Sequence, residues 1–136
     1  MKKTFVYPFN LYTDDIDFYG IAHHSNFLRY MERARNEWLA SLGIKLNEMM
    51  EQHIWFAIKE ADLEFVKPLR LGDQPEVYTE IEEVTHSTMV YDQTIRDRIN
   101  HDIIYCRGKI RVVCINPHIK PRALPQTIVE KLTYAS

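Results

Sequence analysis

The stretch SNFLRYMERARNEWLASL, residues 25–42, predicts one long helix. Ser25 is suited to cap its start, and Gly43 is suited to end it in a left-handed backbone conformation. At 1.5 Å per residue this helix is about 27 Å long, so the rest of the chain must cover its apolar face. That face carries side chains that recur every three or four positions: Phe27, Tyr30, Met31, Ala34, Trp38 and Leu42.

The segments around this helix predict β-strands. Residues 4–13 are rich in aromatic and β-branched side chains, which favours a first strand. After the helix the hydrophobic period becomes two, with turn residues spaced as antiparallel hairpins require. In KEADLEFVKP, residues 59–68, Ala61, Leu63 and Phe65 alternate with acidic residues. Further strands are predicted at 77–85, 88–99 and 103–115, and short helices near 46–50 and 126–135.

The order of these elements predicts the fold class. A length of 136 residues fits a single domain, residues 1–136. A strand, a long helix and a series of antiparallel strands are typical of an α+β protein. The economical way to bury both apolar faces is to wrap one antiparallel sheet of about five or six strands around the helix.

Composition excludes several classes of function. The formal charge is −2, from 17 basic and 19 acidic residues, so nucleic acid is not an expected partner. No uncharged apolar run approaches the ~18 residues of a membrane helix, and no membrane insertion is expected. Cys106 and Cys114 lie in one predicted strand, about 26 Å apart, which is too far for a disulfide. Reduced thiols and a cytoplasmic location are therefore expected.

Titratable residues are concentrated just before the long helix. Asp14, Asp15 and Asp17 precede a turn at Gly20, and His23 and His24 follow it. Free N–H groups at a helix start can hold an oxyanion, and a nearby carboxylate can act on the same carbonyl. Acids before a helix also favour its dipole, which is the simpler interpretation of Asp14 and Asp15. Adjacent histidines point to different sides of a helix, so a metal site is not expected.

The run DIDFYGIAHHSNFLRYMERAR, residues 15–35, resembles the signature of the 4-hydroxybenzoyl-CoA thioesterase family of hotdog-fold proteins, including its acyl-CoA thioesterase branch from the Tol-Pal gene cluster. That signature has an Asp, a Gly three residues later, commonly a His four beyond that, an aromatic residue and a Glu-Arg pair. The resemblance continues through the strand series to about Pro125. The matching residues are Asp17, Gly20, His24, Phe27, Glu32 and Arg33.

The resemblance implies a hotdog-fold enzyme that hydrolyses an acyl-CoA thioester. Asp17 would be the catalytic carboxylate, attacking the carbonyl or activating water; the sequence does not choose between these routes. The backbone N–H near His24 would donate to the thioester oxygen, while the His24 side chain positions substrate or water. One such donor is typically worth about 3 to 4 kcal/mol. Gly20 would allow the turn that brings the acid close to the helix.

Five residues are expected to contact the substrate: Thr13, Asn26, Phe27, Lys67 and Arg70. Some members of the branch have a tyrosine at the position of Thr13, so acyl preference is expected to differ here. Lys67 and Arg70 are candidates for the coenzyme A phosphates. A second group of candidates for the phosphates lies in and after the last strand: Arg107, Lys109, Arg111, Lys120 and Arg122. The three residues within the strand, Arg107, Lys109 and Arg111, have an alternative role, which is to pair with acids across the sheet.

Family resemblance also implies a homodimer or homotetramer with active sites between subunits. No metal or redox cofactor is expected. Coenzyme A is part of the substrate and is not counted as a cofactor. Two alternatives stay open. One is a hotdog hydratase or dehydratase with His24 as base, although a His-Pro-Gly style loop is absent from the sequence. The other is a non-catalytic acyl-CoA binding module in which Asp17 is only a helix-end anion.

Overall fold

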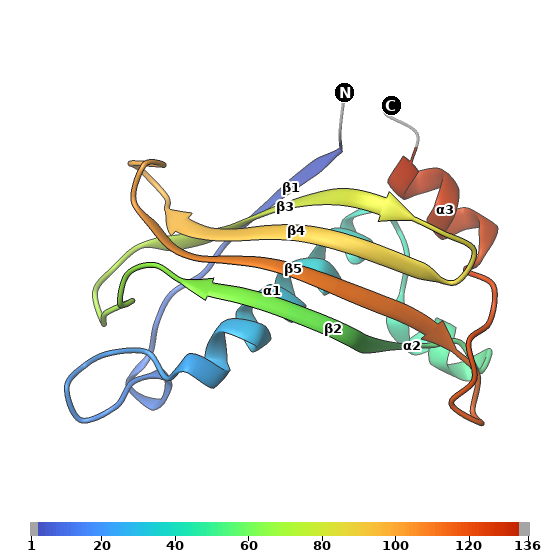
Figure 1. Cartoon of the computed structure of the whole chain (residues 1–136), viewed down its shortest axis with the longest axis horizontal. Helices are drawn as coiled ribbons and strands as arrows, with labels where there is room; N and C mark the ends of the chain where they lie inside the picture. The colour runs from blue at the N-terminus through green and yellow to red at the C-terminus, as the bar shows by residue number, and fades with distance from the viewer. Residues whose placement is uncertain (1–2, 134–136) are drawn as a thin grey trace.

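The computed structural model describes residues 3–133. One long helix lies against a single curved sheet, and three shorter helices lie near the ends of this helix–sheet unit (Figure 1). In chain order the elements are β1 (Thr4–Pro8), the 3-10 helix η1 (Thr13–Asp15), α1 (His24–Ser41), α2 (Leu46–Glu51), β2 (Trp55–Phe65), β3 (Pro75–Val84), β4 (Thr88–Asp97), β5 (Ile104–Ile115) and α3 (Gln126–Thr133).

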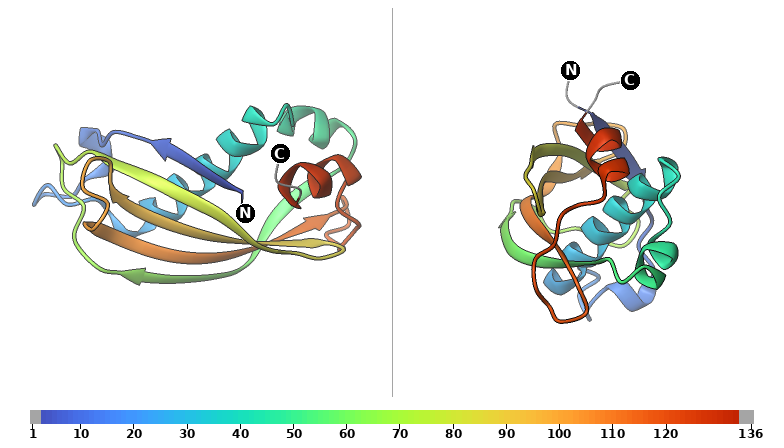
Figure 2. Two further views of the ribbon diagram at one scale, coloured as in Figure 1. Left: turned by 90° about the horizontal axis from the view of Figure 1, so that it is seen from above. Right: turned by 90° about the vertical axis from the view of Figure 1, so that its right-hand side faces the viewer.

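The five strands form one antiparallel sheet in the order β1-β3-β4-β5-β2. Figure 2 shows the sheet curving around α1, which lies along its concave face. The α+β class and the predicted arrangement of helix and sheet are therefore confirmed. β2 pairs with β5 on one side only, so it is an edge strand.

Contact between α1 and the sheet forms the core. The helical face predicted from the sequence is buried, and Trp38 is 3% exposed and stacks on Phe5 of β1 at 6.1 Å between ring centroids. Gly108 of β5 lies where α1 is closest: a Cβ there would be 2.7 Å from Leu63 Cδ2 and 2.9 Å from Met31 Cε. The absence of a side chain at Gly108 therefore lets the helix approach the sheet.

A buried polar network also joins α1 to the sheet. Gln93 of β4 has no exposed surface, and its Nε2 donates to the carbonyl oxygen of Met31 at 2.9 Å and to Thr79 Oγ1 at 3.0 Å. Its Oε1 accepts a hydrogen bond from Arg35 at 2.9 Å. The Gln93 amide thus satisfies three polar groups, two from α1 and one from β3.

The sequence-based boundaries were wrong in two places before the helix. β1 ends at Pro8 rather than residue 13, and the chain turns into η1. The cap of α1 is His23 and not Ser25, which lies inside the first turn. The end of α1 is as predicted, since Gly43 has φ = +81°. Residues 134 and 135 of the predicted last helix lie outside the described residues.

Both cysteines are free and buried. Burial raises the pKa of the Cys106 thiol to about 11 and also raises that of Cys114. Both cysteines are therefore core residues. Over residues 3–133, none of the helices is long and apolar enough to cross a membrane.

Candidate active site

Asp17 lies on a tight loop between η1 and α1. The loop is closed by two backbone hydrogen bonds, from the Asp17 N–H to Ile21 O at 2.8 Å and from the Gly20 N–H to Asp17 O at 3.1 Å. Gly20 has φ = +78°, a conformation that side-chain-bearing residues rarely adopt, and a Cβ there would meet no atom within 4 Å. Gly20 is therefore required by backbone conformation and not by crowding.

The connection between β2 and β3 holds this loop in place. The Ala22 N–H donates to Leu69 O at 2.8 Å, and the Leu71 N–H donates to Gly20 O at 3.1 Å. Leu69 itself has no exposed surface. The position of the loop is thus fixed by a segment about fifty residues away in the sequence.

The Asp17 carboxylate is held by one of its oxygens. Oδ1 accepts hydrogen bonds from the backbone N–H groups of Tyr19 at 2.8 Å and Ile21 at 3.1 Å. Within residues 3–133, Oδ2 has no hydrogen-bond partner. The Ile21 N–H lowers the pKa of Asp17 below its ordinary value against the effect of partial burial, and the Tyr19 N–H lowers it further. The group is therefore a fixed carboxylate with one oxygen available for chemistry.

The start of α1 supplies unpaired donors. The His23 N–H donates to Asp15 O at 3.1 Å, and the Asn26 N–H donates to His23 O at 3.0 Å. In the described part of the chain, the N–H groups of His24 and Ser25 have no acceptor. Such groups at a helix start favour an anion, so this terminus can stabilise a developing oxyanion.

The Asp17 loop and the start of α1 line one groove of about 320 Å³. It brings together four of the predicted site residues: Asp17, His24, Phe27 and Lys67. Its remaining walls are Ile21, Ala22, Phe65, Val66, Pro68 and Leu69.

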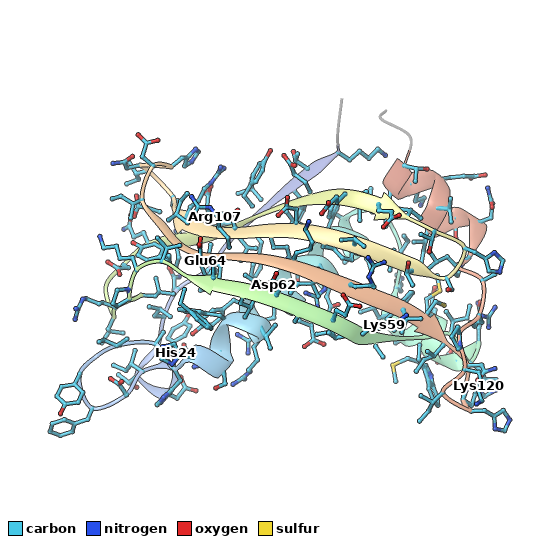
Figure 3. All side chains as sticks on the ribbon, in the orientation of Figure 1. His24, Lys59, Asp62, Glu64, Arg107 and Lys120 are labelled. Atoms are coloured by element: carbon cyan, nitrogen blue, oxygen red, sulfur yellow. The ribbon has the colours of Figure 1, made fainter. Side chains whose placement is uncertain are left out.

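Phe65, at the end of β2, is the main residue that the sequence-based site lacked. Its ring centroid is 5.0 Å from that of His24 and 5.4 Å from that of Phe27. Figure 3 shows His24 at the start of α1, beside the end of β2. The sequence placed Phe65 on the apolar face of a strand, but it had no signal for the meeting of that strand end with the helix start.

Three predicted substrate contacts lie outside the groove lining. Thr13 is exposed on η1, and Arg70 is exposed beside the loop. Asn26 is 6% exposed, and its Nδ2 donates to Asp15 O at 2.9 Å. Its side chain therefore supports the loop rather than facing the groove.

Asp15 connects the loop to α1 through hydrogen bonds, a role beyond the favourable charge near the helix start that the sequence predicted. Its carboxylate accepts hydrogen bonds from the Tyr12 N–H at 2.8 Å and from the Tyr30 hydroxyl at 3.0 Å. Burial, together with the Asp15 carboxylate, raises the pKa of Tyr30. Asp15 thus ties the loop to α1, while Asp14 is exposed.

The basic residues of β5 pair with acids on the outer face of the sheet. Arg107 lies 3.0 Å from Glu64, Lys109 lies 3.1 Å from Glu82, and Arg111 lies 3.9 Å from Glu60. Figure 3 shows Lys120 at the end of the molecule opposite His24. Lys67 is thus the candidate phosphate contact at the groove itself. Among residues 3–133, no three His, Cys, Asp or Glu side chains are grouped to hold a metal ion.

A long helix held by a five-stranded antiparallel sheet, with a carboxylate in the groove at the helix start, is the arrangement of the hotdog class of thioesterase-like proteins. The fold is shown by a 1,4-dihydroxy-2-naphthoyl-CoA thioesterase from Synechocystis, with a TM-score of 0.88 at 24% identity, covering 96% of each chain. A structure from Aquifex aeolicus has a TM-score of 0.86 at 28% identity, covering 95% of this chain and 99% of that one.

The sequence pattern of the thioesterase-like superfamily matches residues 11–132, and the chain belongs to this superfamily. The acyl-CoA thioester hydrolase YbgC of Escherichia coli is 32% identical over 126 residues, which cover 92% of each chain. The acyl-CoA thioesterase YbgC of Haemophilus influenzae is 27% identical over 130 residues, covering 94% of this chain and 93% of that one. The family resemblance predicted from the sequence is therefore confirmed.

Proposed function

We propose that this chain is an acyl-CoA thioesterase in which Asp17 is the catalytic carboxylate. The observation that carries the proposal is the state of that carboxylate: Oδ1 is held by two N–H groups, while Oδ2 has no partner among the described residues. It lines the same groove as the start of α1. The relatives named as acyl-CoA thioester hydrolases support the choice of substrate class.

The proposed reaction adds water across the thioester carbonyl. Asp17 Oδ2 either removes a proton from the water that attacks the carbonyl carbon or attacks that carbon itself. The carbonyl oxygen becomes an oxyanion that accepts hydrogen bonds from the His24 and Ser25 N–H groups. The C–S bond then breaks and the coenzyme A thiolate takes up a proton, from Asp17 in the first route and from solvent in the second. In the second route the anhydride left on Asp17 is hydrolysed by water to the free acid.

The groove offers different surroundings to the two parts of the substrate. Phe27 and Phe65 provide an apolar wall for the acyl group near the thioester. Lys67 is exposed and lies at the groove, where its ammonium can contact a phosphate. The two buried cysteines support a reducing compartment such as the cytoplasm for the proposed enzyme.

The proposal is tested by release of free thiol from a panel of acyl-CoA esters. Cys106 and Cys114 have no exposed surface, so the protein's own thiols contribute little to a colorimetric thiol assay. We expect saturable hydrolysis of at least one ester by the wild-type protein. Binding of acyl-CoA without thiol release from any ester would favour the binding module instead.

The pH dependence of kcat/KM separates a carboxylate from a histidine base. The pKa of Asp17 lies below the ordinary value of 3.8, so the Asp17 carboxylate stays ionised at every pH above 3.8. We therefore expect no acidic limb in kcat/KM between about pH 5 and 8, where an unperturbed histidine base would give one near pH 6.5. Circular dichroism at each pH controls for unfolding. A limb near pH 6.5 in folded protein contradicts the assignment.

The proposal includes a homodimer formed through β2. The free edge of this strand is 11 residues long and exposes Ile58 and Phe65 at 45% and 49%. Lys59 and Asp62, both labelled in Figure 3, have no ion-pair partner within residues 3–133. Antiparallel pairing with a second copy would cover the edge and set Lys59 against acids of the partner. It would also bring the start of one β2 to the Asp17 groove of the other copy.

Lys59→Glu is expected to weaken this dimer by about tenfold or more, because the strand edge then carries only acidic charges. Sedimentation equilibrium measures the dissociation constant. Lys120→Glu makes the same charge change on an exposed residue of the loop after β5, outside the free edge of β2, and should leave the constant unchanged. A wild-type protein that stays monomeric at all concentrations contradicts the dimer.

A further inference from the structure

A second cavity of about 330 Å³ lies between α1, α2 and the start of β2. It shares no lining residue with the Asp17 groove, although α1 and β2 contribute residues to both. Its volume falls in the range of small-molecule sites. The walls are largely apolar and include Leu39, Leu46, Met50, Ile54, Phe56, Ile58, Met89, Tyr91 and Val112.

The cavity contains a buried cation that makes no ion pair within residues 3–133, although the Glu32 carboxylate favours its charged form from a greater distance. Arg35 is 6% exposed and lines the cavity. It donates to the neutral Gln93 amide at 2.9 Å and lies 5.7 Å from the centre of the Tyr91 ring. No carboxylate among residues 3–133 lies within ion-pair distance of it. Burial lowers the pKa of Arg35, which is the cost of holding this charge away from water.

One residue of the cavity wall carries a buried polar donor without an acceptor within residues 3–133. Trp55 lines it, and its indole Nε1 is buried with no hydrogen-bond partner within residues 3–133. A buried donor that makes no bond destabilises a protein by about 1 to 3 kcal/mol. An acceptor supplied by a ligand would remove that cost.

We propose that this cavity binds a small carboxylic acid with an apolar chain or ring, whose carboxylate accepts hydrogen bonds from Arg35 and Trp55. A guanidinium is suited to a carboxylate, and the apolar walls suit a hydrocarbon. A neutral lipid would leave the cation unpaired. Glu32 also lines the cavity and repels any anion there, so the single charge of a carboxylate is favoured over the double charge of a phosphate.

Two sources can supply this chemistry. One is a free acid, such as the product of thioester hydrolysis. The other is the acyl part of a thioester that ends in a carboxylate, reaching the cavity from the groove of a partner copy. Binding itself does not depend on catalysis by Asp17.

The test is a titration of 15N-labelled protein with octanoate, with 1-octanol as the matched neutral compound. The chain has two tryptophans, so two indole N–H signals report on the titration. We expect the Trp55 signal to shift with octanoate and not with octanol, while that of the core residue Trp38 stays in place. An unmoved Trp55 signal, or an equal response to octanol, overturns the proposal.

Variants locate the binding. Arg35→Met should weaken octanoate binding by about tenfold or more, while Arg33→Met, an exposed arginine on the same helix, should not change it. Trp55→Phe keeps an aromatic ring and is the second variant if Arg35→Met does not fold; calorimetry should show weaker binding. Unchanged affinity in a folded Arg35→Met or Trp55→Phe protein overturns the proposal.

Kinetics distinguishes the two sources. Octanoate that raises KM without changing kcat indicates that the cavity receives the acyl part of the substrate. Octanoate that lowers kcat without changing KM indicates a separate site for free acid. Asp17→Asn protein should bind octanoate like the parent, so failure of the proposed catalytic function does not affect this result.

Discussion

Asp17→Asn is expected to lower kcat for acyl-CoA hydrolysis by about 10³-fold while leaving the fold intact. The asparagine side-chain oxygen can still accept the hydrogen bonds that Tyr19 and Ile21 donate to Oδ1. The variant loses the negative charge and the free oxygen that the proposed chemistry uses. A positioned acid or base typically contributes 10² to 10⁴-fold. Thiol release under saturating substrate measures the effect.

Asp14→Asn is the matched control for this prediction. Asp14 is an exposed acid three residues earlier and does not line the groove. Its replacement makes the same chemical change and should leave kcat within about twofold, as expected of a surface substitution away from the chemistry. If the folded Asp17→Asn protein binds acyl-CoA and hydrolyses it as fast as the parent, the catalytic assignment is wrong.

Gln93→Leu is expected to lower the free energy of unfolding by about 3 kcal/mol. Leucine fills a similar volume but makes none of the bonds that Gln93 makes to Met31, Thr79 and Arg35. The main cost is the guanidinium, which stays buried and loses its hydrogen-bond acceptor. Urea unfolding followed by circular dichroism gives the change.

The control for this substitution is Gln74→Leu, at an exposed position before β3. It should change the free energy of unfolding by less than about 0.5 kcal/mol. Adding Arg35→Met to Gln93→Leu removes both polar partners and should recover part of the loss. A Gln93→Leu protein as stable as the parent would show that the network has no net effect on stability.

Much of the fold could be predicted because its elements have clear local periods. The α1 face from Phe27 to Leu39 follows the helical repeat, and β5 alternates between apolar and basic residues. The end of β1 could not be predicted in this way, because residues 9–13 keep strand-like composition after the chain has left the sheet. The path of the chain after β1 is stabilised by contacts with residues far away in the sequence. One example is Arg98, which donates to Phe9 O at 2.6 Å and to Pro75 O at 3.1 Å.

For the candidate site, the residues that are close in sequence are the ones that the sequence pattern could bring together. Asp17, Gly20 and His24 form one local pattern, and the structure places Asp17 and His24 at one groove. Phe65 enters that groove from another element, and Asn26 is turned away from it by the Asp15 carbonyl. The sequence pattern predicts Arg35 on a charged, solvent-exposed helix face. In the structure Arg35 is buried and donates a hydrogen bond to Gln93.

The attachment of the Asp17 loop to residues 69–71 has an evolutionary consequence. Insertions or deletions in the β2–β3 connection would move the carboxylate relative to the helix start, so the length of this connection should be under strong purifying selection. Within the described residues, the segment 116–125 after β5 makes no such backbone hydrogen bond to the loop and can vary more freely in length. New acyl specificities should therefore arise by side-chain replacement in the β2–β3 connection and by length changes elsewhere.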